Sequence, residues 1–139
     1  MSLKETIQAF LDIAESQPSI NSQDTGSVYE ILNACPVQKY GAFVLTQGQH
    51  RWYDDRDEYY FYLFYADRNK DDNSNVVENQ STAHRVLKNI IKTFVETYDA
   101  EVVDLTFNSF NERFTDMCSG MYATIRIAIP ESYTCEEVY

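Results

Sequence analysis

The residue spacing that most resembles a metal site lies in one polar stretch, residues 67–78. Side-chain oxygens occur there at positions 1, 3, 5, 7, 9 and 12 of a twelve-residue loop, the spacing with which a calcium loop wraps one Ca²⁺. The residues at these positions are Asp67, Asn69, Asp71, Asn73, Asn75 and Glu78. Two features differ from such a loop: Asp72 replaces the glycine of the sharp turn, and an apolar strand precedes it. The alternative is a polar strand-to-helix turn in which Glu78 helps to cap the helix.

A second acidic group precedes the most apolar part of the chain. It consists of Asp54, Asp55, Asp57 and Glu58, with Arg51 and Arg56 interleaved. Such a group can hold a metal or a basic partner, but mixed charge at this density is also typical of a solvated hairpin tip.

Signatures of catalysis are missing from the sequence. His50 and His84 are the only histidines, and neither belongs to a metal-binding spacing. The chain contains neither a GxSxG motif nor a glycine-rich phosphate loop. We therefore expect a protein that is not an enzyme and that has no cofactor, apart from the calcium ion considered above.

The bulk composition narrows the class of partner. With a formal net charge of -11, the chain lacks the excess of Lys and Arg that binding to nucleic acid or to an anionic membrane requires. The odd set of Cys35, Cys118 and Cys135 has no CxxC spacing, which favours free thiols in a reducing compartment. No apolar run is long enough to span a bilayer and no signal peptide is evident. We expect one cytoplasmic domain over residues 1–139 that binds proteins.

The chain is organised around a strand at residues 59–66. Both of its alternating faces are apolar or aromatic, whereas a strand with one face in water alternates with polar residues. The strand is therefore covered on both faces, or one face meets another subunit. Tyrosine suits the second case, because its ring buries area while its hydroxyl keeps a hydrogen bond.

Other periodic segments supply the remaining elements. Helices are predicted at 3–16, where Ser2 and Glu5 have capping-box spacing, and from about Asn75 to Tyr98. Strands are predicted at 40–47, 101–107 and 121–129, with a polar connection at 108–120. Residues 17–39 contain turn chemistry at 21–26 and a possible strand at 27–32, and we interpret them as an extended arm; 131–139 is an acidic tail. The order predicts an α+β fold, an antiparallel sheet of about four to five strands with two helices packed on one face.

This order of elements resembles the small α+β proteins that complete tailed-phage particles: the tail-terminator, tail-completion and neck proteins. The resemblance rests on the helix at 3–16, the apolar strand Tyr60–Tyr65 ending in Asp67, the Asp/Asn turn, the helix to Tyr98, and the strands Val102–Phe107 and Met121–Ile129. It implies a non-enzymatic virion protein of a phage or prophage, which forms a ring with copies of itself and contacts other protein subunits. Because such proteins use sheet edges and arms as interfaces, it implies interface positions at Tyr60, Tyr62, Phe64, Val28 and Ile31.

Two other functions remain open from the residues. The charge of -11 on a small α+β domain also suits an acidic inhibitor or immunity-type binding protein. The loop at 67–78 would suit a small calcium-binding domain.

Overall fold

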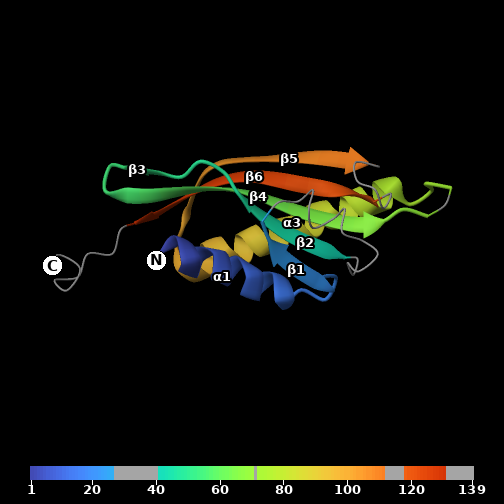
Figure 1. The fold of residues 1–139 in the computed structure, drawn as a ribbon, viewed down its shortest axis with the longest axis horizontal. Helices are drawn as coiled ribbons and strands as arrows, with labels where there is room; N and C mark the ends of the chain where they lie inside the picture. Colours follow the sequence, from blue (N-terminus) through green and yellow to red (C-terminus); the bar gives the residue numbers. More distant parts are fainter. Residues whose placement is uncertain (27–40, 71, 112–117, 131–139) are drawn as a thin grey trace.

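The computed structural model describes residues 1–26, 41–70, 72–111 and 118–130. These residues form two helices and six strands (Figure 1). The elements are α1 (Leu3–Glu15), β1 (Ser22–Thr25), β2 (Ala42–Gln47), β3 (Arg51–Tyr53), β4 (Arg56–Arg68), α3 (Val76–Tyr98), β5 (Glu101–Asn111) and β6 (Cys118–Pro130). The α+β class is confirmed.

The strands form one sheet in the order β1-β2-β4-β6-β5, and β3 pairs with the first residues of β4. Neighbouring strands are antiparallel except β1 and β2, which are parallel. The sheet is therefore mixed and has six strands, where four to five antiparallel strands were expected. The two additional strands are short, and polar β1 has no apolar alternation, so periodicity could not reveal it.

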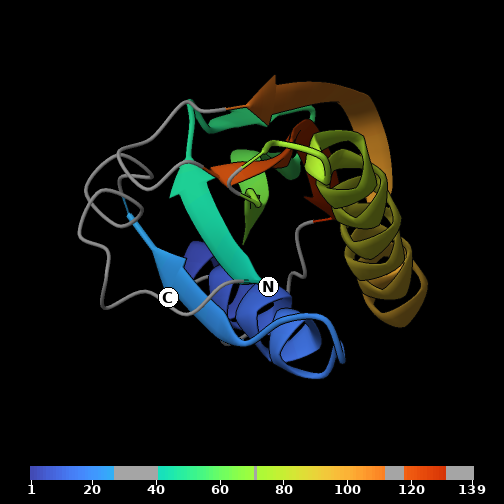
Figure 2. The ribbon, with the colours of Figure 1, turned by 90° about the vertical axis from the view of Figure 1, so that its right-hand side faces the viewer.

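The helices cover one face of this sheet, and both contribute to its core (Figure 2). Phe10 of α1 stacks on Phe94 of α3, with ring centroids 4.2 Å apart. Phe10 also meets Phe61 of β4 edge-on at 5.7 Å. The residues of β4 on this face are all buried: Tyr59, Phe61, Leu63 and Tyr65. Side chains of this size stabilise the fold by about 1.5–3 kcal/mol each when fully buried.

Local signals at the helix ends were read correctly at α1 and only in part at α3. The capping box of α1 is present, since Ser2 Oγ accepts from the Glu5 backbone N–H at 3.1 Å and Glu5 accepts from that of Ser2 at 3.2 Å. Asn75 occupies the N-cap position of α3 but makes no side-chain cap. Its amide oxygen instead accepts a hydrogen bond from the Lys70 backbone N–H at 2.8 Å, which closes the turn before the helix.

The last hairpin is longer than predicted. Residues 108–111 continue β5, and 118–120 begin β6, so most of the expected polar connection is strand. The misreading has a physical cause: β5 is an edge strand whose residues are mostly exposed, and polar residues such as Asn108 and Ser109 therefore fit there. In the expected arm, 22–25 is a strand of the sheet, whereas 27–40 and the acidic tail 131–139 lie outside the described residues.

Candidate functional site

The oxygen ligands predicted for calcium are largely engaged by the protein itself. Asp67 accepts hydrogen bonds from the Gly41 backbone N–H and the Tyr65 hydroxyl, each at 3.1 Å. Asn69 is buried, and its amide oxygen accepts from Ser119 Oγ at 2.6 Å. These contacts hold the end of β4 against β2 and β6, so both side chains have structural partners without a metal.

Two further predicted ligands, Asn73 and Glu78, lie at the surface. Asn73 is exposed with a left-handed backbone (φ 57°), and Glu78 is exposed in the first turn of α3. Within the described ranges, no three His, Cys, Asp or Glu side chains come together as a metal site. Asp71 lies outside these ranges, and the calcium site stays a prediction.

The face of the sheet opposite the helices, which we call the second face, carries a separate set of side chains. At one end it forms a small apolar cluster, to which Tyr62 and Tyr122 add partly buried rings. The buried members of this cluster are Ala42, Val44, Phe64, Ala66, Phe110 and Cys118. The rest of the second face becomes polar toward the β3–β4 hairpin.

The predicted interface residues of β4 all lie on this second face, but they differ in access. Phe64 is only 7% exposed and stacks on Tyr122 with ring centroids 5.1 Å apart. Tyr60 and Tyr62 are partly exposed, and their rings meet edge-on at 5.2 Å. The two tyrosines, rather than Phe64, are therefore the accessible part of the predicted surface. Val28 and Ile31 fall outside the described residues.

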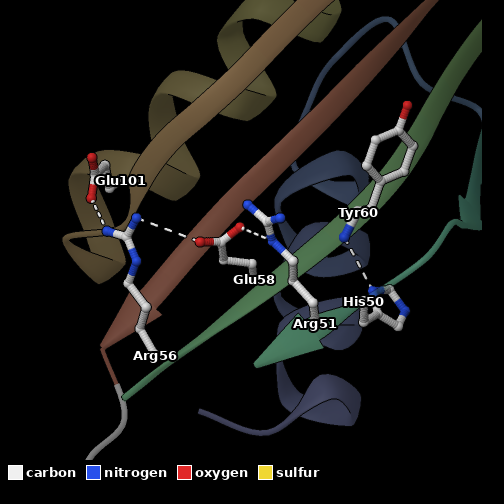
Figure 3. Close-up of polar contacts among 6 residues, drawn as sticks. All are labelled: His50, Arg51, Arg56, Glu58, Tyr60 and Glu101. Atoms are coloured by element: carbon white, nitrogen blue, oxygen red, sulfur yellow. Dashed lines mark hydrogen bonds and ion pairs between the residues drawn. The ribbon is translucent and has the colours of Figure 1, made fainter. Parts of the chain in front are cut away.

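A buried carboxylate organises the charged end of the second face (Figure 3). Glu58 is 1% exposed and lies between Arg51 at 2.7 Å and Arg56 at 3.5 Å. Arg56 also reaches Glu101 of β5 at 2.6 Å. The hydrogen bond from Arg51, with the charges of the nearby arginines, lowers the pKa of Glu58 from its usual range. The carboxylate is therefore ionised at neutral pH and ties β3 to β4.

His50 lies beside β4, with its ring centroid 5.4 Å from that of Tyr59 and 5.5 Å from that of Phe61. Its Nδ1 accepts a hydrogen bond from the Tyr60 backbone N–H at 3.1 Å, and its Nε2 lies 3.0 Å from the side-chain oxygen of Gln47. The neutral ring with hydrogen on Nε2 satisfies both contacts. Burial, and then the positive charge of Arg126, lower the pKa of His50, which favours this neutral form.

The tip of the β3–β4 hairpin presents aromatic residues to solvent. Asp54 and Asp55 both have positive φ, 55° and 58°, as a two-residue type I′ turn requires. The preceding Trp52 and Tyr53 are 60% and 64% exposed. Large exposed aromatic side chains are typical of surfaces that contact proteins.

The far edge of the sheet offers another exposed apolar surface. Among the described residues, β5 pairs only with β6, and its Val102 and Val103 are exposed. A groove of about 400 Å³ lies between β5 and α3. Its lining includes Ile91, Val95, Leu105 and Phe107, together with Lys88 and Lys92.

Sequence reasoning missed the pairing of Glu58 and took the whole acidic group for a solvated hairpin tip. A signal was present, because Arg51 and Glu58 are equally distant from the Asp54–Asp55 turn and a two-residue turn places them opposite each other. Arg126 lies in the predicted strand at 121–129, and no local spacing singles it out, because its position opposite Tyr60 depends on the β4–β6 register.

Comparisons with known proteins add no relative: no protein-family model matches the chain, and no curated protein matches it. In the described ranges, no helix combines the length and apolarity needed to cross a membrane.

Proposed function

We propose that this chain is a non-enzymatic assembly protein of the tail-terminator or tail-completion type, which acts by forming a ring with copies of itself. The observation that carries the proposal is the eleven-residue edge strand β5 with its exposed valines. The register of β5 with β6 shifts between Val102 and Asp104 and is regular from Asp104 to Asn111. This regular part of the edge displays backbone donors and acceptors that another chain can pair with.

Several features of the surface support contact with protein rather than catalysis. The apolar groove beside β5 continues the edge onto the helix layer, so a partner strand at this edge would find both hydrogen bonds and apolar area. The exposed aromatic pair at the β3–β4 tip and the accessible tyrosines of the second face are of the residue types enriched in interfaces.

A ring forms when one surface of each copy contacts a different surface of the next copy. The two edges of the described sheet, β1 and β5, differ in length and composition, and a contact that joins β5 to a surface other than β5 lacks two-fold symmetry. Contact between β5 of one copy and a different surface of the next is heterologous, and a heterologous contact that closes produces a ring. The proposal of a ring also rests on the resemblance to the phage proteins, which is based on the order of helices and strands.

The test is mass in solution, measured by light scattering over a concentration series. We expect the wild type to form an oligomer of one discrete mass, and the fraction of chains in this oligomer should rise with concentration. Val103→Lys places a charge on the β5 edge and should shift the midpoint of association at least ten-fold to higher concentration. Ser81→Lys makes the same charge change at an exposed position of α3 and is the matched control. It should not shift the midpoint of association.

Two results would count against the proposal. A wild type that stays monomeric at every concentration would favour the acidic binding protein instead. Equal behaviour of the Val103 and Ser81 variants would remove β5 as the interface.

A further inference from the structure

A small pocket on the second face is lined by polar and tyrosine side chains, unlike the apolar cluster at the other end of that face. It measures about 340 Å³ and is lined by Gln49, Tyr60, Tyr62 and Arg126. Tyr60 and Arg126 lie directly opposite each other on β4 and β6, and Gln49 comes from the β2–β3 connection. We call this the Arg126 pocket.

Arg126 lines the pocket with a hydrogen-bonding group that no described residue satisfies. Its guanidinium lies over the Tyr60 ring at 4.8 Å. Its Nη1 is shielded from solvent yet has no hydrogen-bond partner in the described part of the chain. A buried donor without an acceptor destabilises the fold, and a charged donor does so more strongly. The protein therefore holds a cationic donor that an incoming oxyanion would satisfy.

Acidic side chains nearby do not fill this role in the structure. Glu58 is taken by Arg51 and Arg56. Asp104 lies opposite Arg126 in the β5–β6 register, yet within the described residues no carboxylate approaches Arg126 as an ion pair. A counter-ion for Arg126 would therefore come from outside the described residues.

The other lining groups fit the same ligand. The hydrogen bond with Tyr62 is the main cause that raises the pKa of Tyr60, so the phenol stays protonated at neutral pH. Phenol hydroxyls and the Gln49 amide are neutral donors, and a guanidinium binds a carboxylate through two parallel hydrogen bonds. A doubly charged phosphate is less favoured than a singly charged carboxylate, because Asp104 lies opposite Arg126 in the β5–β6 register and repels the greater charge more strongly.

We propose that the Arg126 pocket binds a carboxylate, supplied by an Asp or Glu side chain of a neighbouring copy of this chain. The choice of a neighbouring copy rests on the proposed ring. Each copy carries 22 Asp and Glu against 11 Lys and Arg, so acidic side chains are in surplus on every subunit. The interaction joins an aromatic–arginine pocket of one copy to an acidic side chain of the next.

The carboxylate specificity is tested by NMR titration with N-acetyl-glutamate amide as the probe and sodium phosphate at equal ionic strength as its competitor. We expect the Arg126 Nε–Hε and His50 ring signals to shift and saturate at millimolar probe. Arg126→Gln should weaken this binding at least ten-fold, whereas Arg85→Gln on exposed α3 should leave it unchanged. An unsaturable shift, or phosphate binding as tightly as the probe, would overturn the carboxylate assignment.

The source of the carboxylate is tested separately by light scattering of the same two variants. We expect Arg126→Gln to weaken association at least ten-fold relative to Arg85→Gln. Probe binding without this loss would overturn the neighbouring copy as the source. A monomeric wild type would refute the proposed ring, while the titration would still decide the pocket.

A variant that keeps Arg126 tests the pocket even if substitution of that arginine unfolds the protein. Tyr62→Phe removes one hydroxyl from the pocket and should weaken probe binding about three- to ten-fold with an unchanged far-UV spectrum. Unchanged probe affinity in this variant would contradict the assigned lining.

Discussion

Adjacent residues of β4 should respond very differently to truncation, because they lie on opposite faces of the sheet. Leu63 is fully buried against the helices, whereas Tyr62 is partly exposed on the second face. Leu63→Ala removes three buried carbon atoms and leaves a cavity, which lowers the free energy of unfolding by about 3–4 kcal/mol. Tyr62→Ala loses partial burial and one edge-on ring contact, worth about 1–2 kcal/mol.

Urea unfolding followed by far-UV circular dichroism distinguishes these values. With a slope of about 2 kcal/mol per molar urea, Leu63→Ala should lower the midpoint by about 1.5–2 M and Tyr62→Ala by less than about 1 M. Leu63→Met is the control, since a swap of similar volume costs less than about 1.5 kcal/mol. A larger loss for Tyr62→Ala than for Leu63→Ala would refute the assignment of the two faces.

Three further predictions concern the polar groups. The pKa of His50 is lowered on folding, so the effect of His50 on stability should be constant above pH 6.5. Stability should decrease below pH 6.5, because the unfolded state gains a proton there before the folded state does. His50→Gln should therefore reduce the decrease in melting temperature between pH 7.5 and 5.5. Because the pKa of Glu58 is lowered on folding, its contribution to stability is present above pH 4.5 and is lost as the pH falls through the folded pKa. Glu58→Gln should therefore have a lower melting temperature than the wild type at pH 7, and a smaller difference from it at pH 3. Equal differences in melting temperature at the two pH values would contradict the pairing with Arg51. Millimolar Ca²⁺ should leave the melting temperature unchanged, and a saturable rise would establish the site at 67–78.

The sequence predicted the elements whose residues alternate between core and solvent. The capping box at Ser2, the apolar stripe of α3 and the doubly apolar strand β4 depend on local spacing, which periodicity reveals directly. Strands β1 and β3 were missed because they have four and three residues and expose most of their side chains. Such strands form through backbone pairing with a neighbour, and their own composition does not specify it.

The candidate site depends on strand register, which explains why sequence reasoning found only part of it. Tyr60 and Tyr62 were found because tyrosine in an otherwise apolar strand is a local signal. Arg126 becomes notable only when the β4–β6 pairing places it opposite Tyr60, and Glu58 only when the turn pairs it with Arg51. A shift of one residue in either pairing would move these side chains to the other face.

The distribution of charge links the pocket to assembly. A chain with a net charge of -11 repels its own copies, so association needs local cationic sites that offset the repulsion. Arg51 and Arg56 form ion pairs with Glu58, whereas Arg126 forms no ion pair with a described residue. An acidic side chain placed there would satisfy the shielded Nη1 of Arg126 and reduce the repulsion between subunits in the same contact. Association should therefore strengthen with salt in Arg126→Gln, where only repulsion is screened, and respond less in the wild type, where salt also screens the attraction.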